Sequence, residues 1–243
     1  MKTALFAHRG DSGNAPENTL AAFRRVRDTG ADGVEFDVQA TRDGVPVVIH
    51  DESLERTTDG LGLLQEHTLE EIRRLDAGSW RDPAFAGERV PTLAEALEVF
   101  RGTPLTVNLE VKTHILPYPG LAEAVVGEVR AREMSGQVLL ASFNHHTLLE
   151  LGRLAPEIPR AVLVRSHLIE PWTYVAAHGF HALHPEHHAC TETLVRGCHA
   201  AGLAVRAFAP NGEEDVRRLI GLGVDAVLTS YPARMVALRD SLE

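Results

Sequence analysis

Residues 33–38 read Gly-Val-Glu-Phe-Asp-Val, and residues 105–111 read Leu-Thr-Val-Asn-Leu-Glu-Val. Both stretches are short and rich in β-branched and apolar residues, which is typical of strands rather than helices. In a strand, residues two positions apart project from the same face, so Glu35 and Asp37 face one way. The same spacing separates Glu110, in the second stretch, from Lys112, which follows that stretch. The two stretches therefore predict neighbouring buried strands that bring charged groups to one surface.

Apolar β-rich runs alternate with amphipathic segments over the rest of the chain as well. The other predicted strands are Ala4–Ala7, Val138–Ser142, Ala161–Val164, Ala182–His184, Ala204–Phe208 and Ala226–Thr229. The predicted helical segments include Thr19–Asp28, Leu93–Phe100, Gly120–Met134, His146–Leu154, Glu192–Ala201 and Glu213–Leu222. Thr92 and Glu95 have the spacing of a capping box, and Gly30, Gly202 and Gly223 stand where helices should end.

Eight strands with helices between them, buried on both faces, favour a closed parallel barrel over an open sheet. The length of 243 residues is also close to that of one such barrel. No linker, low-complexity tract or internal repeat marks a domain boundary. We therefore predict an α/β protein with the (β/α)8 TIM-barrel fold, in which residues 1–243 form a single domain.

The chain departs from this alternation after the second strand. The turn Asp43-Gly44 is followed by another β-rich run, Val45–Ile49. About 40 residues then precede the capped helix, a length that is uncommon for a loop without a function. Loops that follow strands form the catalytic rim of such barrels. We therefore predict an insertion at about residues 51–90 that covers the site or shapes its substrate preference.

The overall charge limits the class of partner. The 24 basic and 34 acidic residues give a formal net charge of −10. This charge argues against a nucleic-acid partner, because phosphate backbones require clustered Lys and Arg. A small anionic substrate stays compatible, since a bound cation can invert the local field.

The sequence also offers no transmembrane segment and no disulfide framework. No stretch approaches the roughly 20 apolar residues of a membrane helix, and the apolar run at the N-terminus is too short for a signal peptide. The expected location is therefore cytoplasmic. Cys190 and Cys198 are interpreted as buried thiols of the helix around residues 191–201. The oligomeric state is not readable from the sequence.

Charged and titratable side chains gather at the predicted C-terminal ends of the first strands, which meet at one mouth of a barrel. In chain order they are His8, Arg9, Glu35, Asp37, His50, Asp51, Glu110 and Lys112. Three carboxylates aimed at one point repel one another unless a cation lies between them. Oxygen ligands favour a hard ion such as Mg²⁺, Mn²⁺ or Ca²⁺. We therefore predict a divalent metal site; the alternative is a buried ion-pair network of these carboxylates with Arg9 and Lys112.

The two histidines at this mouth add acid–base chemistry. Imidazole titrates near neutral pH, so His8 and His50 are suited to exchange protons with a substrate. Either histidine alone would more often have a structural role. Arg9 and Lys112 beside a divalent ion suit the oxygens of a phosphate. Together these groups predict a site for phosphoryl transfer.

Ordered motifs along nearly the whole chain carry a family resemblance. They are His8-Arg9-Gly10, Pro16-Glu17-Asn18-Thr19, Glu35-Phe36-Asp37-Val38, His50-Asp51, Leu54–Thr58, Leu75–Trp80, Pro91–Glu95, Asn108-Leu-Glu110-Val-Lys112, Gly223-Val-Asp225 and Tyr231-Pro232. This set resembles the glycerophosphodiester phosphodiesterases. The resemblance implies a metal-dependent hydrolase of lipid and glycerol metabolism that converts glycerophosphodiesters to glycerol 3-phosphate and an alcohol.

By the same resemblance, the site residues form an acid–base pair, the ligands of one Mg²⁺ or Ca²⁺ ion, and the contacts to phosphate. In that order they are His8 and His50; Glu35, Asp37 and Glu110; and Arg9 and Lys112. A further implication is that the glycerol 2-hydroxyl attacks first, giving a cyclic phosphate that water then opens. One histidine would deprotonate the nucleophile and the other would protonate the leaving group.

Two more residues are candidates for substrate binding. Glu17 lies in the loop after the first strand, where Asn14 also fits phosphate positioning, and Phe208 offers an apolar face to the glycerol or alcohol. The family often has Trp where Phe208 stands and Asp where Ser230 stands. These departures leave the reaction type unchanged, and we expect them to affect substrate preference.

The histidines His181, His184, His187 and His188 lie close together in the sequence. A second metal site is one interpretation, but the loose spacing on a loop favours ordinary structural roles. Among the four, His184 stands at the end of a predicted strand. We therefore expect it to be the one that contacts substrate.

Two alternatives to this function stay open. A related barrel phosphodiesterase that acts on lysophospholipids or sphingomyelin would use the same catalytic residues and differ only at the rim. A non-catalytic barrel that only binds a ligand would have lost one or more of the predicted catalytic histidines and metal ligands. All five of these residues are present: His8, His50, Glu35, Asp37 and Glu110.

Overall fold

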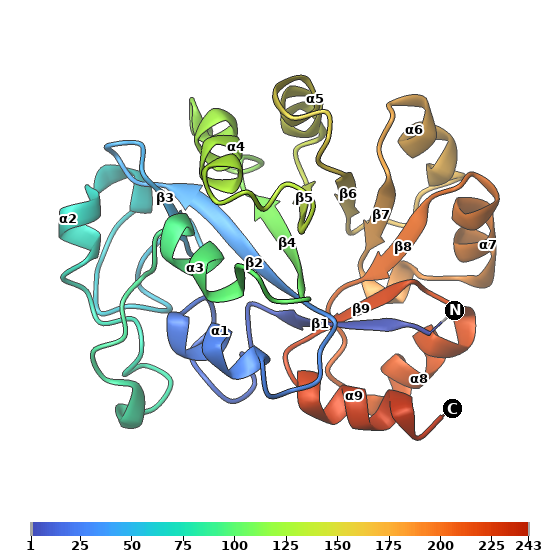
Figure 1. Ribbon diagram of the computed structural model, residues 1–243, viewed down its shortest axis with the longest axis horizontal. Coiled ribbons are helices and arrows are strands. Elements are labelled where there is room, and N and C mark those ends of the chain that lie inside the picture. Colours follow the sequence, from blue (N-terminus) through green and yellow to red (C-terminus); the bar gives the residue numbers. More distant parts are fainter. Residues whose placement is uncertain (1, 243) are drawn as a thin grey trace.

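The computed structural model describes residues 2–242, and its eight parallel strands form a barrel (Figure 1). The strands are β1 (Ala4–His8), β2 (Gly33–Ala40), β4 (Thr106–Val111), β5 (Val138–Ser142), β6 (Arg160–Val164), β7 (Ala182–Pro185), β8 (Ala204–Ala207) and β9 (Ala226–Thr229). They lie side by side in chain order, and β1 pairs with both β2 and β9, which closes the barrel. The predicted TIM-barrel fold is confirmed, and each predicted strand agrees with an observed one to within two residues.

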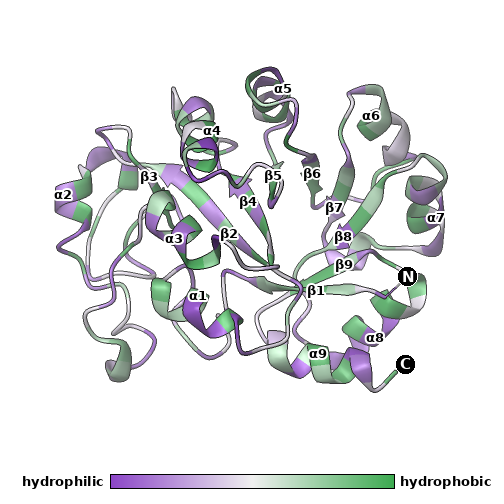
Figure 2. Cartoon of the chain, viewed as in Figure 1, coloured by the Kyte–Doolittle hydropathy of each residue, from purple (hydrophilic) through white to green (hydrophobic). Residues whose placement is uncertain are grey.

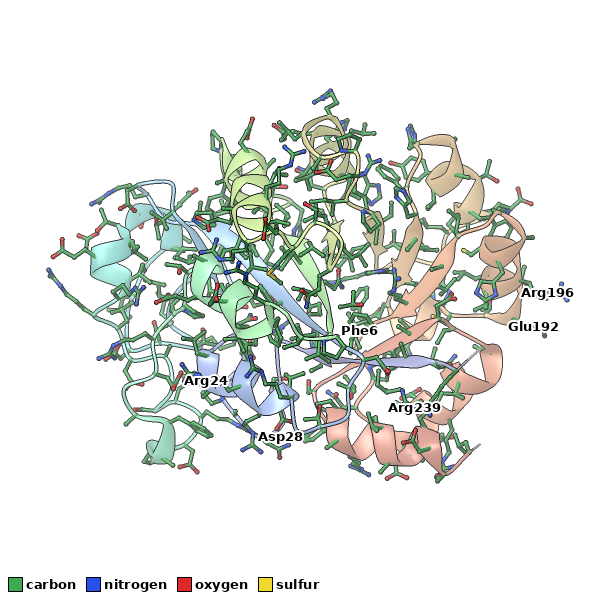
Figure 3. The ribbon with its side chains drawn as sticks, in the orientation of Figure 1. Phe6, Arg24, Asp28, Glu192, Arg196 and Arg239 are labelled. Atoms are coloured by element: carbon green, nitrogen blue, oxygen red, sulfur yellow. The ribbon has the colours of Figure 1, made fainter. Side chains whose placement is uncertain are left out.

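Helices surround the barrel on its outside (Figure 1). They are α1 (Leu20–Val26), α3 (Leu93–Phe100), α4 (Leu121–Ala131), α5 (His145–Leu154), α6 (Pro171–Ala177), α7 (Glu192–Ala200), α8 (Glu213–Leu222) and α9 (Pro232–Asp240). Hydrophobic and hydrophilic residues are mixed along these helices (Figure 2), as the amphipathic pattern requires. Glu192 and Arg196 form an ion pair at 3.5 Å on the outer side of α7 (Figure 3).

Local signals fix several helix ends as predicted. The Thr92 hydroxyl accepts a hydrogen bond from the Glu95 N–H at 3.2 Å, and the Glu95 carboxylate accepts one from the Thr92 N–H at 2.9 Å. Gly223 ends α8 with a φ of 76°, a conformation that glycine adopts at little cost. One prediction is wrong in part: Cys198 lies in α7, but Cys190 precedes the helix, where the 3₁₀ turn His187–Ala189 ends. Both thiols are buried and free, as predicted.

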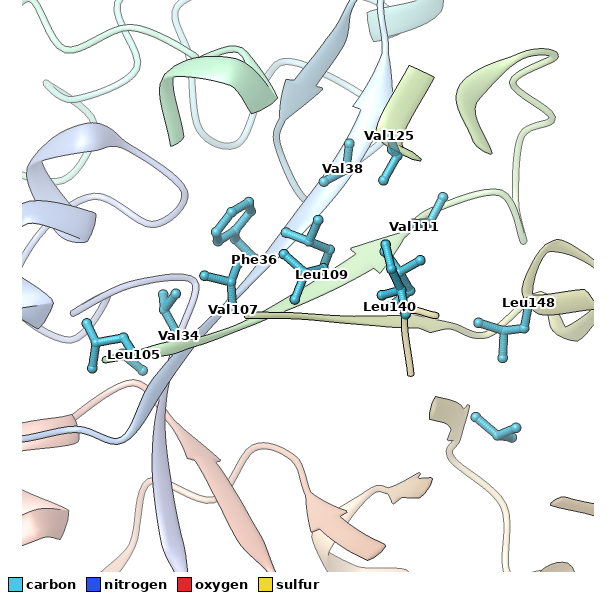
Figure 4. Close-up of a cluster of buried hydrophobic side chains, with 14 of the residues drawn as sticks. Val34, Phe36, Val38, Leu105, Val107, Leu109, Val111, Val125, Leu140 and Leu148 are labelled. Carbon is cyan, nitrogen blue, oxygen red and sulfur yellow. The ribbon is translucent and has the colours of Figure 1, made fainter. Parts of the chain in front are cut away.

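Strand residues alternate between the barrel interior and a larger core under the helices. Phe36 of β2 is fully buried, and its ring centroid lies 4.9 Å from that of Phe23 in α1 and 6.2 Å from that of Phe100 in α3. Figure 4 shows Phe36 beside Val34 in this outer core. Phe6, at the centre of Figure 3, packs instead with apolar residues of β9. The alternation that sends Phe36 outward sends its charged neighbours in sequence inward.

Replacement of Phe36 by alanine is expected to destabilise the fold by about 3–5 kcal/mol, the usual cost of removing a buried aromatic ring. Chemical denaturation followed by circular dichroism measures the change. Leu61→Ala is the control, because 76% of the Leu61 residue surface is exposed, and it should change stability by less than about 0.5 kcal/mol. Equal effects of the two substitutions would contradict the described packing.

The predicted insertion follows β3 (Pro46–Val48), which pairs antiparallel with β2. The segment contains the short helix α2 (Leu69–Ile72) and lies at the left of Figure 1. It encloses a hydrophobic cluster of its own, made of Val47, Ile49, Leu54, Leu64, Ile72, Ala77 and Val90. This cluster gives the segment a fixed shape beside the end of β2, where the charged residues lie.

Candidate active site

Strand register brings the predicted site residues to one end of the barrel. His8 of β1 is paired in register with Glu35 of β2, and Asp37 of β2 is paired with Glu110 of β4. Because these strands are parallel, all four residues lie toward their C-terminal ends, where the active sites of such barrels lie. His50 follows β3, and it lies near enough to Asp37 for its charge to help lower the pKa of that carboxyl.

The three predicted metal ligands converge. Glu35, Asp37 and Glu110 each offer a carboxylate oxygen, and these atoms lie within 4.8 Å of one another. The residues are only 3%, 1% and 8% exposed. Burial, followed by the charge of Asp37, raises the pKa of both Glu35 and Glu110. Oxygen donors that are buried and repel each other in this way fit a hard divalent cation.

Two cations partly neutralise this cluster. The Lys112 ammonium lies 3.2 Å from Glu110 and 3.7 Å from Asp37, and Arg9 Nε lies 3.4 Å from Asp37. Burial would raise the pKa of Asp37, but these cations and His50 outweigh it and hold the pKa low. The ion-pair network that the sequence offered as an alternative is therefore present. It leaves three carboxylates facing two cations, so a divalent ion remains compatible with the charge.

Glu35→Gln is expected to stabilise the metal-free protein at neutral pH. The pKa of Glu35 is higher in the folded chain than its ordinary value of 4.5, so the folded state binds this proton more tightly than the unfolded state. Stability conferred by Glu35 is therefore full at acid pH and is lost as the pH rises from 4.5 toward the raised pKa. Glutamine removes that loss, although it also removes a metal ligand.

Thermal unfolding of the metal-free proteins between pH 4 and 8 measures this effect. Glu123→Gln on the exposed surface of α4 is the control, and it should leave the pH dependence unchanged. A Glu35→Gln protein whose stability fell with pH as steeply as that of the unsubstituted chain would contradict the assigned role of this carboxyl.

The two predicted catalytic histidines have different surroundings. Burial, followed by the charge of Arg9, lowers the pKa of His8 to about 3, so its imidazole is neutral at neutral pH. His50 Nδ1 lies 2.6 Å from the Asp51 carboxylate, which orients the ring and leaves Nε2 for other contacts. The His8 ring is therefore neutral at neutral pH, and the His50 ring is held by a neighbouring carboxylate.

Residues that the sequence analysis did not single out hold these groups in place. The Arg56 guanidinium, from the inserted segment, donates to Asp51 and binds both oxygens of Glu17 at 2.8 and 2.9 Å. Glu17 in turn accepts from Arg9 at 2.7 Å. Glu17 therefore anchors two arginines, and its predicted contact with substrate stays a prediction. The sequence analysis included Arg56 only within the motif Leu54–Thr58 and gave it no role of its own.

Two amides complete the support. The Asn18 side chain donates to Asp37 at 2.8 Å. The Gln39 amide lies within hydrogen-bond distance of the carbonyls of residues 49–51, and the Tyr118 hydroxyl donates to Gln39 at 2.7 Å. These contacts hold the backbone around His50 in place. Gln39 and Tyr118 are 79 residues apart in the sequence, so only the folded chain brings them together.

Phe208 reaches the site as predicted. A cavity of about 20 Å³ is lined by His8, Glu35, Asn108, Glu110, Leu163, Phe208 and Leu228. A space of this volume holds about one water-sized group. Within residues 2–242, the buried Asn108 Oδ1 has no hydrogen-bond partner. An unpaired buried acceptor beside two carboxylates is further support for a bound cation or ligand here.

The other histidine predictions fare differently. His184 is completely buried, and it does not line the described cavity. Within residues 2–242, both of its ring nitrogens are buried without a hydrogen-bond partner, and its contact with substrate stays a prediction. His187 and His188 meet near Asp215, a residue that the sequence analysis did not connect with them. The Arg218 guanidinium lies 3.7 Å from Asp215 and already offsets its charge, which leaves little attraction for a cation.

Comparison with known proteins identifies the family. The sequence model of the glycerophosphoryl diester phosphodiesterase family matches residues 8–234. The chain belongs to this family. A glycerophosphodiester phosphodiesterase of Caldanaerobacter subterraneus subsp. tengcongensis is 42% identical over 238 residues, which cover 98% of each chain. One of Bacillus altitudinis is 37% identical over 99% of this chain and 100% of its own.

Solved structures agree with this family assignment. The structure of an Oleispira antarctica phosphodiesterase in complex with the product sn-glycerol-3-phosphate has a TM-score of 0.88 and 36% identity, covering 98% of this chain and 97% of that chain. A glycerophosphodiester phosphodiesterase of Agrobacterium tumefaciens has a TM-score of 0.84 and 31% identity over 97% and 99%. The predicted family and the predicted enzyme class, phosphoric diester hydrolase, are confirmed. Within residues 2–242, no helix is long and apolar enough to span a bilayer.

Proposed function

We propose that this glycerophosphodiester phosphodiesterase hydrolyses small glycerophosphodiesters to glycerol 3-phosphate and an alcohol. The observation that carries this proposal is the convergence of Glu35, Asp37 and Glu110 at the mouth of a barrel of this family, beside a cavity that His8 lines. His50 lies near enough to Asp37 for its charge to help lower the pKa of that carboxyl. The product named for the Oleispira antarctica relative supports the same chemistry. We also propose that residues 1–243 act as one domain in the cytoplasm, with the insertion at about residues 51–90 as part of the site.

The metal is proposed to be one Mg²⁺ or Ca²⁺ ion. Glu35, Asp37 and Glu110 would hold it, because they offer three converging oxygens and no nitrogen or sulfur ligand. When bound, such an ion neutralises phosphate charge and makes the phosphorus easier to attack. Arg9, which Glu17 holds in place, would bind a phosphate oxygen as a second positive charge beside the metal ion. Lys112, which lies beside Asp37 and Glu110, would be a further cation for the phosphate.

In the proposed first step, the glycerol 2-hydroxyl attacks phosphorus. His8 accepts the hydroxyl proton, because its imidazole is neutral. The bond between phosphorus and the leaving oxygen breaks, and His50 Nε2 donates the proton that makes the leaving group an alcohol. The products of this step are the alcohol and a cyclic glycerol phosphate.

The second step restores both histidines. Water attacks the cyclic phosphate, and neutral His50 accepts its proton while Asp51 keeps the ring oriented. The bond from phosphorus to the glycerol O2 breaks, and His8 returns its proton to that oxygen. The product is glycerol 3-phosphate, and the protons balance over the two steps.

A substrate panel tests the proposed function. The metal-supplemented enzyme is assayed with glycerophosphocholine, glycerophosphoethanolamine and glycerophosphoglycerol, and with a lysophospholipid and sphingomyelin as alternatives. We expect turnover of the glycerophosphodiesters with release of glycerol 3-phosphate. Preferential turnover of either lipid would instead favour the related barrel phosphodiesterases, and binding without any turnover would favour a non-catalytic barrel.

A further inference from the structure

An aromatic contact leads out of the catalytic cavity. Phe208 lines that cavity with His8 and Glu110, and its ring meets Phe143 edge to face with the centroids 5.8 Å apart. Phe143 follows β5 and is itself half-buried. It also lines an open hollow of about 400 Å³ formed by the loops and helix starts on the same end of the barrel. Phe143 therefore stands between the reacting atoms and a space large enough for a small alcohol.

One cation lies on this aromatic ring. Arg165, the first residue after β6, places its guanidinium carbon 4.8 Å from the centroid of the Phe143 ring. This distance is that of a cation–π contact, which keeps the charge at a fixed place. Within residues 2–242, Arg165 forms no ion pair, whereas Arg9, Arg56 and Lys112 at the mouth are each paired with carboxylates.

Arg165 therefore carries its positive charge on one wall of the mouth without a carboxylate partner among residues 2–242. The carboxylates Asp37, Glu110, Glu17 and Asp51 instead form their ion pairs with Arg9, Lys112 and Arg56. A quaternary ammonium group commonly binds on an aromatic face, but Arg165 already occupies a face of Phe143 and repels a second cation. The same guanidinium presents a planar set of donors that suits a carboxylate or a phosphate.

We propose that Arg165 and Phe143 form a subsite for the leaving alcohol and favour alcohols that carry an oxyanion over those that carry a bare ammonium. This inference rests on the proposed function, because it assumes that a glycerophosphodiester occupies the catalytic cavity. The glycerol phosphate portion lies at the carboxylates, and the alcohol extends past Phe208 toward Arg165. The subsite selects the substrate and takes no part in proton transfer.

Two matched substrates isolate the oxyanion. Glycerophosphoserine is glycerophosphoethanolamine with one added carboxylate, so the ratio of their kcat/KM values reports on that group alone. Arg165→Gln is expected to lower this ratio by about 3- to 10-fold, the range for a partly screened charge pair. Arg165→Lys keeps the charge and should retain part of the preference. Turnover of glycerophosphocholine should rise in Arg165→Gln.

Arg153→Gln is the control, because Arg153 is also exposed and lies near the other end of α5, away from the mouth. It should leave the ratio unchanged. A ratio that is the same in Arg165→Gln and the unsubstituted enzyme would overturn the subsite while leaving the proposed function intact.

Absence of turnover on every diester would overturn the proposed function. The subsite is then judged by calorimetric binding of the same two compounds to the metal-loaded protein. Preferential binding of glycerophosphoserine that Arg165→Gln removes would support it, and equal binding of the two compounds would overturn it.

Discussion

Removal of divalent metal with a chelator is expected to abolish turnover while the barrel stays folded. The three proposed ligands are buried carboxylates that repel each other, and burial and Asp37 raise the pKa of two of them. Without the divalent ion, Arg9 and Lys112 alone face these carboxylates and an approaching phosphate. The fold does not depend on the ion, because the core under the helices is apolar and separate from the site. Turnover and circular dichroism, measured on the same chelated sample, check both parts.

Readdition of metal identifies the ion. Mg²⁺, Ca²⁺ and Zn²⁺ are added back separately, and a hard ion is expected to restore turnover because all three proposed ligands are oxygens. Glu110→Gln should lower metal affinity, whereas Glu123→Gln on α4 should not. Full activity in the chelated enzyme, or restoration by Zn²⁺ alone, would contradict the proposed site.

The second large effect concerns the histidines. His8→Ala and His50→Ala are each expected to lower turnover by about 10²–10⁴-fold, the usual span for loss of a positioned acid or base. Metal affinity should change little, because neither histidine is a proposed ligand. The double substitution should cost less than the product of the single effects, since the two groups act as a unit. Steady-state kinetics at saturating metal measure these changes.

His167→Ala provides the matched control, because His167 is exposed on the loop that follows β6. It should retain normal turnover on the same substrates. We expect a bell-shaped pH–rate profile for the unsubstituted enzyme, and each single variant should lose one of its two limbs. Near-normal turnover in both His8→Ala and His50→Ala would end the acid–base assignment and favour attack by a hydroxide ion.

Asp51→Asn tests how much the Asp51 carboxylate contributes to turnover in addition to the His50 ring. The hydrogen bond between His50 Nδ1 and Asp51 Oδ1, at 2.6 Å, orients that ring. The lowered pKa of Asp51, about 2, comes first from the Arg56 hydrogen bond and keeps this carboxylate ionised. An amide can still contact the ring but carries no charge beside it, so we expect a smaller loss of turnover than in His50→Ala, measured by the same steady-state kinetics.

The sequence by itself determined the strand order and the central charges of the site. Period-two alternation in residues 33–38 and 105–111 put Glu35, Asp37 and Glu110 on inward faces. The end of α3 at Phe100 and its capping box at Thr92 were also readable, because these signals involve neighbours in the chain. Such features depend on local backbone geometry, which short stretches of sequence specify.

Only the tertiary structure decided which distant side chains support those charges. Arg56 reaches Glu17 across 39 residues, and Arg165, after β6, meets Phe143, after the neighbouring strand β5. The sequence placed His184 at a strand end, but its complete burial became visible only in the structure. Contacts of this kind depend on barrel curvature, loop course and side-chain rotamers set by many residues together. No local pattern encodes them, because the partners come together only when the barrel closes.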